Sequence, residues 1–511
     1  MRGHHFISRR WFIGGMAATA GTAFSGCRFI RAGKGEASAA AKPKLRLGIV
    51  SDIHIKTAGK PDESPLSGSN NLTFRKTLEW FDAQGVDGVI VAGDMADNGM
   101  VEQLEAVAEA WYAVFPEDKG KDGRHVEKLF VYGNHDWEGY RYGDFAERLY
   151  ADPEERIKHI LRYDYKGHWE RIFHEPYSPV WLKTVNGFSV VGANWCNDYC
   201  RGWEETGVPG VEEFFSANRS KINPERPFFY IQHPHPKDTC YGHWAWGHDN
   251  GGATRALSPF PNAIAFSGHS HYSLSDERSI WQGAFTSIGT SSLRYTGAPT
   301  ASLPGLGFEN TTTSFRGTKL TKDEVRLITN RKVMPSLGTG TGRQGMLLSV
   351  YEDCVRIVRR EFVFGESLGE DWVMPLPASE AKPFAFALRK QKAVAPQFAE
   401  DAKLAMKLGQ LKNRANKRVA AVTLTFPAAG DAKLRPFDYE VSVEREDGSV
   451  VLTRYVLSSD FHLPSSKRHA RQTFAISCDQ LPQDTLFRFV VRPRESFGRA
   501  GKGLAGEFIR L

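Results

Sequence analysis

The sequence predicts an α/β layered fold followed by a smaller all-β region, and three observations carry this prediction. Short runs rich in Val, Ile, Leu and Phe recur in the front half of the chain, and each ends abruptly at Gly, Asp, His or Asn, as buried strands end in loops. Helical candidates at 74–84 and 101–115 separate the early runs, so strand and helix alternate. The length of 511 residues exceeds what one core usually holds, which favours two domains.

The strand-like runs divide the chain into two regions. We place the first region at 45–370, with predicted strands at 45–55, 88–93, 128–133, 188–194, 227–232, 263–268 and 284–289. Prolines interrupt the pattern at 371–391, which predicts a linker. Beyond it, at 392–511, we expect a β-sandwich accessory domain with strands at 418–426, 439–444, 449–457, 472–476 and 486–491.

The first 27 residues are typical of an export signal. Arg9 and Arg10 precede three large apolar residues and then a short run of small apolar residues at 14–23. This order resembles a bacterial twin-arginine signal rather than a transmembrane anchor. We therefore expect an exported protein, either periplasmic or anchored on the extracytoplasmic side of the membrane.

Cys27 leaves two kinds of processing open. The residues before it, Phe-Ser-Gly, resemble a lipoprotein processing site, although Phe24 stands where Leu is usual. Either Cys27 is lipidated and tethers the protein to a membrane, or the signal is cleaved nearby. The stretch at 28–44 is rich in Gly, Ala, Ser and Lys without periodicity, which predicts a flexible tether.

The charge balance argues against a nucleic-acid-binding protein. The formal net charge is +7, and removing Arg2, Arg9 and Arg10 with the signal would leave +4. Lys and Arg are scattered along the chain and form no basic stripe. We expect a solvated surface and no specific binding of nucleic acid.

Polar residues stand where the predicted strands of the first region end. In the α/β class, ligands bind beyond the carboxyl ends of the strands. Residues two apart on an extended segment point the same way, so Asp52 with His54, and His269 with His271, can each converge on one ion. Ten such residues follow the strands: Asp52, His54, Asp94, Asp97, Asn134, His135, Asp136, His233, His269 and His271.

This set of side chains favours transition metals. Neutral imidazoles and carboxylates suit Mn, Fe or Zn better than a calcium site built from oxygen ligands. A carboxylate that can bridge, with mixed His, Asp and Asn sets on either side, is what two neighbouring ions require. Two ions can acidify a shared water, so that a metal-bound hydroxide attacks, and can hold both oxygens of an in-line displacement.

The motifs together resemble the calcineurin-like metallophosphoesterase family over about residues 45 to 290. They are Asp52-Ile53-His54, Gly93-Asp94-Met95-Ala96-Asp97, Gly133-Asn134-His135-Asp136, His233 and Gly268-His269-Ser270-His271. The resemblance implies a four-layered α/β/β/α sandwich with a two-metal centre. It also implies that Asp52, His54 and His271 hold one ion, that Asn134, His233 and His269 hold the other, and that Asp94 bridges them.

The resemblance further implies roles beside the metals. His135 would act as an acid or stabilise the transition state, with Asp136 orienting it. Two histidines, His233 and His235, follow the same predicted strand. His233 stands directly at the strand end and is therefore the expected ligand, whereas His235 is expected to support the site or to contact substrate. The related purple acid phosphatases place a tyrosine three residues after the bridging aspartate. Asp97 stands there in this chain, so we do not expect a tyrosinate-bound ferric site.

Aromatic residues between Asn134 and His233 are expected to build the pocket wall. Most should fill the core, whereas Trp137 and Tyr140, just after the metal motif, are the candidates for substrate contact. The predicted function is metal-dependent hydrolysis of a phosphate ester, and the sequence leaves monoesters and diesters open. The alternative is a binding or scaffold module that keeps a vestigial metal site.

Overall fold

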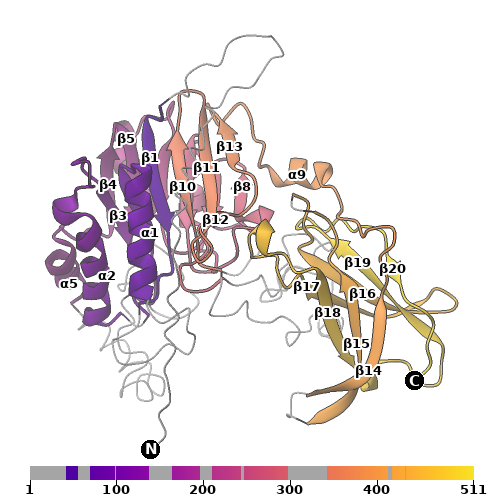
Figure 1. Ribbon diagram of the computed structural model, residues 1–511. Helices are drawn as coiled ribbons and strands as arrows, with labels where there is room; N and C mark the ends of the chain where they lie inside the picture. The colour runs from indigo at the N-terminus through magenta and orange to yellow at the C-terminus, as the bar shows by residue number, and fades with distance from the viewer. Residues whose placement is uncertain are drawn as a thin grey trace, which may run out of the picture.

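The chain forms an α/β region built on two mixed sheets, followed by a β-rich C-terminal region (Figure 1). The computed structural model describes residues 42–55, 70–97, 99–136, 164–195, 210–242, 247–296, 342–412, 417–431 and 433–511. The predicted export signal, almost all of the predicted tether, and Trp137 and Tyr140 lie outside these ranges. The α/β class and the additional C-terminal sheets agree with the prediction.

The first sheet contains seven strands. They are β1 (Leu45–Val50), β2 (Gly88–Ala92), β3 (Glu127–Val131), β10 (Gln344–Val350), β11 (Cys354–Glu361), β12 (Glu366–Ser367) and β13 (Trp372–Pro375). Their order is β12-β11-β10-β1-β2-β3, with β13 also paired to β11. Because β1, β2 and β3 are parallel, the loops after them emerge at one edge of the sheet.

The second sheet contains six strands. They are β4 (Val180–Val185), β5 (Phe188–Ala193), β6 (Phe228–Ile231), β7 (Ala263–Ser267), β8 (Ile280–Gln282) and β9 (Thr286–Gly289). Their order is β4-β5-β6-β7-β9-β8, and β5, β6, β7 and β9 are parallel.

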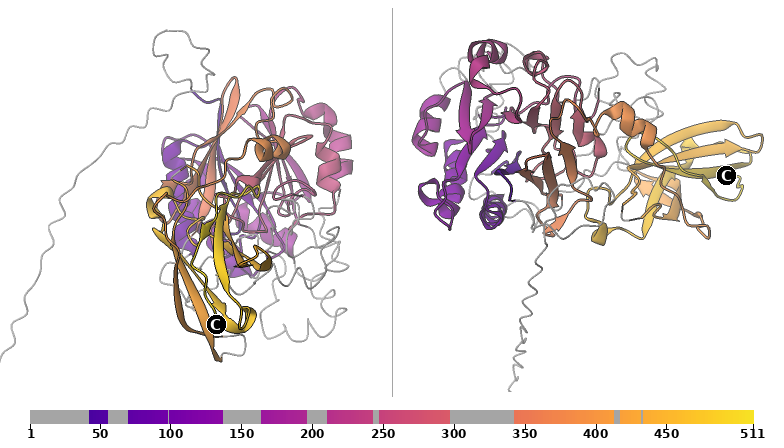
Figure 2. Two further views of the ribbon diagram at one scale, coloured as in Figure 1. Left: turned by 90° about the vertical axis from the view of Figure 1, so that its right-hand side faces the viewer. Right: turned by 90° about the horizontal axis from the view of Figure 1, so that it is seen from above.

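Helices pack on the outer faces of both sheets. The first sheet carries α1 (Asn70–Gln84), α2 (Val101–Val114) and α5 (Tyr165–Phe173) (Figures 1 and 2). In α2, Leu104, Val107 and Trp111 recur three and four residues apart, so one face of the helix is buried. A separate apolar cluster packs α6 (Val211–Asn218) and α7 (Gly252–Leu257) on the second sheet.

The two sheets also share an apolar core. One cluster combines side chains of both sheets, such as Ile49 of β1 and Ile231 of β6. This packing brings the loop edges of the two sheets together. Backbone bonds then link loops of different sheets, from Trp195 N–H to the carbonyl of Tyr132 (3.0 Å) and from Leu293 N–H to the carbonyl of Ser51 (3.1 Å).

The C-terminal region consists of two small sheets around one apolar cluster. Its strands are β14 (Ala405–Lys412), β15 (Arg418–Pro427), β16 (Asp438–Arg445), β17 (Val450–Leu457), β18 (Arg471–Ser477), β19 (Phe487–Arg494) and β20 (Leu504–Ala505). The region lies to one side of the α/β region, with α9 (Phe386–Lys392) between them (Figures 1 and 2). The segment predicted as a linker is partly sheet, because residues 372–375 form β13 on β11.

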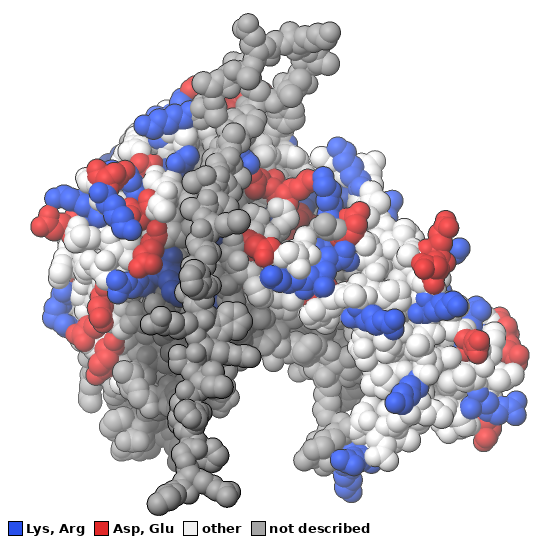
Figure 3. Space-filling view, viewed as in Figure 1, with Lys and Arg blue, Asp and Glu red and all other residues white. Residues whose placement is uncertain are grey.

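Among the described residues visible in Figure 3, no extended patch of one charge is seen. Blue Lys and Arg side chains alternate there with red Asp and Glu side chains over both regions. Among the helices of the described ranges, none is long and apolar enough to span a membrane.

Candidate metal centre

The predicted ligands lie on loops at the joined edges of the two sheets. The loop after β1 is paired to the loop after β2 by bonds from Asp52 N–H to Gly93 O (3.0 Å) and from His54 N–H to Asp94 O (3.0 Å). The loop after β7 joins them, because the backbone N–H of His269 donates to the Asp52 carboxylate (3.2 Å). These bonds hold three loops of different origin around one point.

Five of the predicted ligands have left-handed backbone conformations: φ is 49° at Asp52, 47° at His54, 51° at Asp94, 70° at His269 and 56° at His271. Such φ values are costly for residues other than glycine, at about 1–3 kcal/mol each, and they concentrate at functional sites. The expected extended geometry is therefore wrong for both pairs. Asp52 and His54 nevertheless meet in one cluster, whereas His269 and His271 belong to different clusters. The strands end at Val50 and Ser267, and left-handed turns direct the side chains.

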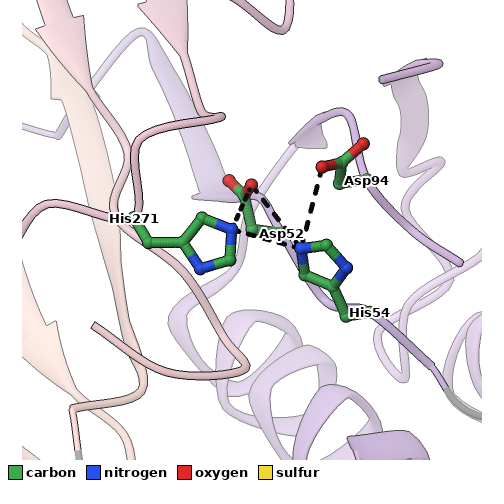
Figure 4. Close-up of side chains that lie close together, drawn as sticks. All are labelled: Asp52, His54, Asp94 and His271. Atoms are coloured by element: carbon green, nitrogen blue, oxygen red, sulfur yellow. Dashed lines mark hydrogen bonds and ion pairs between the residues drawn. The ribbon is translucent and has the colours of Figure 1, made fainter. Parts of the chain in front are cut away.

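The first cluster consists of Asp52, His54, Asp94 and His271, which face one another in Figure 4. Asp52 Oδ1 lies 2.9 Å from His271 Nε2 and 3.9 Å from His54 Nε2. His54 Nε2 lies 3.7 Å from Asp94 Oδ2. One ligand atom of each residue lies within 4.8 Å of those of the others, and all four residues are buried. This spacing can hold a metal ion.

The second cluster consists of Asp94, His233 and His269, whose ligand atoms also lie within 4.8 Å of one another. Asp94 Oδ2 is 3.0 Å from His233 Nε2, so the same carboxylate belongs to both clusters. Asn134 is buried, and within the described structure its amide oxygen has no hydrogen-bond partner. A buried, unsatisfied acceptor is costly, and a metal ion would satisfy it.

For two of the histidines, a backbone carbonyl determines which ring nitrogen faces the cluster. His233 Nδ1 lies 2.8 Å from Ala92 O, and His271 Nδ1 lies 3.2 Å from Tyr295 O. A carbonyl can only accept, so each Nδ1 must carry the proton, which leaves Nε2 to face the carboxylates. This is the arrangement expected of imidazole ligands whose orientation is set by a hydrogen bond on the opposite nitrogen.

The electrostatics of the centre favour a cation. Burial alone would raise the pKa of Asp94, but the imidazoles of His233 and His135 hold that pKa well below its ordinary value. Burial opposes protonation of His233, yet the Asp94 carboxylate outweighs it and raises the pKa of His233 to about 9. The negative potential that would retain a proton on His233 is the potential that attracts a metal ion.

Glycines allow the loops to approach the ligands closely. A Cβ atom on Gly133 would stand 2.3 Å from Asp94 Oδ1, and one on Gly268 would stand 2.4 Å from Asp52 Oδ2. Neither position tolerates a side chain without displacing a carboxylate of the first cluster.

His135 lies beside the clusters and is held by the backbone. Its N–H donates to Asp94 Oδ1 (2.9 Å), and its Nδ1 donates to the carbonyl of Asp97 (2.7 Å). Its ring meets that of His54 edge-on, with 4.8 Å between centroids. These contacts place His135 next to the ligands without making it part of either cluster.

Asp136 does not orient the His135 ring, contrary to expectation. Its carboxylate accepts from the N–H groups of Ala96 and Gly133, each at 2.7 Å, and so ties the loop after β2 to the loop after β3. Burial and the charge of Asp94 raise the pKa of Asp136 to about 7. The physical reason for the correction is that both carboxylate oxygens of Asp136 accept from backbone N–H groups, while Nδ1 of His135 donates to the carbonyl of Asp97.

Asp97 has a role that the sequence did not reveal. Its carboxylate lies 3.4 Å from His54 Nδ1, and its carbonyl accepts from His135. One residue thus contacts a ligand of the first cluster and the neighbouring histidine. The sequence offered two signals, its place after a predicted strand and its place three residues after Asp94 where the related family has a tyrosine, and neither indicated a support.

His235 is fully buried, and hydroxyl groups engage both of its ring nitrogens. Nδ1 lies 2.7 Å from Ser267 Oγ and Nε2 lies 2.7 Å from Ser270 Oγ. The ring therefore lies beneath the loop that carries His269, as a support. This geometry does not favour substrate contact by His235.

Comparisons with known proteins agree with the site. Residues 45–273 match the family described as calcineurin-like phosphoesterase. No curated protein matches the chain.

Among solved structures, the chain is similar to a dimetal phosphatase from Danio rerio, with 12% identity over 65% of this chain and 99% of that chain and a TM-score of 0.35. It is also similar to a purple acid phosphatase from yellow lupin (Lupinus luteus) seeds, with 13% identity over 68% and 57% of the two chains and a TM-score of 0.38. These likenesses are too distant to transfer a substrate. The family match is what identifies residues 45–273 as a calcineurin-like phosphoesterase domain.

Proposed function

We propose that this protein hydrolyses phosphate esters at a centre of two metal ions. The observation that carries the proposal is the position of Asp94, whose carboxylate is common to both ligand clusters. A carboxylate has two oxygens and can bridge two ions, whereas a single-ion site would need only one of the clusters.

The residues of each cluster fit the ions proposed for them. Asp52, His54 and His271 would hold one ion, and Asn134, His233 and His269 the other, with Asp94 between them. Mixed nitrogen and oxygen ligands suit Mn, Fe or Zn. When bound, two such ions supply a nucleophile from water at neutral pH and neutralise charge on the phosphoryl oxygens.

His135 would donate a proton to the leaving oxygen. His135 Nδ1 donates to the carbonyl of Asp97. Nε2 is therefore the ring nitrogen that would donate a proton to the leaving oxygen. The bond from its backbone N–H to Asp94 fixes the residue beside the bridging carboxylate. We propose a general acid at this position, with Asp97 orienting it.

A turnover screen tests the function. Metal-free protein would be loaded with Mn, Zn or Fe and offered a phosphate monoester, a linear diester and a cyclic nucleotide. We expect metal-dependent hydrolysis of at least one class, lost when the metal is chelated. Binding of two ions without turnover of any ester would support the alternative, a binding module with a vestigial site.

We also propose that the sandwich of the first region is the four-layered α/β/β/α arrangement of the family, and that the protein is exported. The export proposal rests on Arg9-Arg10 ahead of the small apolar run. Replacing both arginines by lysine should leave the precursor in the cytoplasm, and unchanged export would reject the twin-arginine route. Cys27→Ala should release the protein from membranes if Cys27 is lipidated.

A further inference from the structure

The side chain of Gln344, the first residue of β10, connects the α/β region to the C-terminal region. It is fully buried, and hydrogen bonds use both ends of its amide. Oε1 accepts from Leu274 N–H (2.7 Å), Ser273 Oγ (3.1 Å) and Ser291 Oγ (3.2 Å). Nε2 donates to the carbonyl of His462 (2.9 Å), which belongs to the C-terminal region.

The segments on the Oε1 side lead directly to the first cluster. Ser273 and Leu274 follow His271 by two and three residues. Ser51 Oγ lies 2.9 Å from the carbonyl of Ser291 and within hydrogen-bond distance of the Asp52 carboxylate, so its single proton lies between these two acceptors. Gln344 therefore supports both Asp52 and His271, each through one intervening segment.

The acceptor on the C-terminal side is held firmly in place. The turn that contains His462 is buried, and its carbonyls at Asp460 and Leu463 accept from the guanidinium group of Arg435. The Asp460 carboxylate accepts from Ser458 Oγ (2.7 Å) and from the N–H of His469 (2.8 Å). Because this turn is held by several hydrogen bonds, the carbonyl of His462 has a defined position and can position the side chain of Gln344.

A second contact fixes the same segment further along. Arg278, seven residues after His271, is fully buried and paired with Asp276 at 2.6 Å. Its guanidinium lies over the ring of Phe437, 4.6 Å from the centroid, and Phe437 belongs to the C-terminal region. The segment after His271 is thus held by the C-terminal region at Leu274, through Gln344, and at Arg278.

We propose that the C-terminal region is a positioning element of the metal centre. Through Gln344 and Arg278 it fixes the loop that carries His271, and so sets the metal affinity of the first cluster. His269 of the second cluster lies on the same loop, two residues before His271, but it also lies against Trp195, and His233 is held by Ala92, so the second cluster has further support within the α/β region. The inference rests on the proposed function for the ligand roles of these residues.

The test compares two buried glutamines. Gln344→Leu removes the bridge, whereas Gln282→Leu is the matched control, since Gln282 is also buried and joins β8 to the N–H of Phe384 (2.9 Å) without touching the ligand loops. Mn²⁺ is titrated into metal-free protein by calorimetry, and unfolding temperatures are recorded. Supporting hydrogen bonds around a metal site are typically worth about 10–100-fold in affinity.

We expect Gln344→Leu to weaken the ion of the first cluster about tenfold or more and the other ion by clearly less, with the control altering neither. Equal weakening of both ions, or none, would overturn the proposal. Phe437→Leu gives a second reading if Gln344→Leu does not fold, because it removes the ring beneath Arg278 and should weaken the same ion. Since the readout is metal affinity, a wild-type protein that binds metal but hydrolyses no ester would count against the proposed function alone.

Discussion

The two ligand clusters share Asp94 but differ in what holds them. The histidines of the second cluster are supported within the α/β region: His233 by the carbonyl of Ala92, and His269 by the ring of Trp195, 5.6 Å away. The first cluster is supported by Asp97, by Tyr295 and, through Gln344, by the C-terminal region. This difference shows that two neighbouring ligand clusters can depend on different parts of the chain for their support.

The largest effect should follow from Asp94→Ala, which removes the only ligand common to both clusters. Both ions should bind more weakly, and turnover should fall by about a thousandfold or more, because two ions contribute several kcal/mol of transition-state stabilisation. Metal content and turnover are measured on the same sample. Loss of a single ion would show that Asp94 does not bridge.

Asp52→Ala and His233→Ala should separate the clusters. Each removes a ligand that only one cluster uses, so each variant should lose one ion and keep the other. Elemental analysis after reconstitution with excess Mn²⁺ gives the count. If both variants lost both ions, the clusters would not be independent and the comparison would fail.

His135→Ala should keep both ions and lose activity. General acid catalysis contributes about a hundredfold or more, and its benefit grows as the leaving group becomes more basic. We expect a heavy loss on an alkyl ester and a smaller loss on a nitrophenyl ester, whose leaving group needs little protonation. Equal losses on the two esters, with metals intact, would leave His135 as an electrostatic group.

Trp195→Leu should have the smallest effect. It should act on the second cluster in the way that Gln344→Leu acts on the first. The indole ring contacts His233 and His269, with centroids 6.0 and 5.6 Å away, and neither of these belongs to the first cluster. We expect the second ion to bind up to about tenfold more weakly and the first to be unchanged. A weaker first ion would mean that the supports are not separate.

The sequence could predict the ligands because of where they stand. Buried apolar runs are a strong signal, and β2, β5 and β7 lie within one residue of their predicted bounds at each end. The polar residues after them must meet where parallel strands end. The seven predicted ligands are found on the loops after β1, β2, β3, β6 and β7, and six of them belong to the two clusters.

Other features depend on contacts between distant residues and were not predictable. The extended geometry assumed for Asp52 and His54 is wrong, because a left-handed turn carries no clear signal when the residue is Asp or His. The strands β10 and β11 were not predicted. They lie far along the chain from the last predicted strand of the first region at 284–289, and β10 joins the sheet only through its pairing with the distant strand β1. The roles of Asp136 and Gln344 arise from hydrogen bonds to residues far away in sequence or in another region.

The most direct test of the account is the number of metal ions per wild-type chain. Metal-free protein is reconstituted with excess Mn²⁺, passed through a desalting column and analysed for metal and protein. The account predicts about two ions per chain, held by the two clusters that share Asp94. At most one ion per chain, reproduced with Zn²⁺ and Fe²⁺, would contradict it.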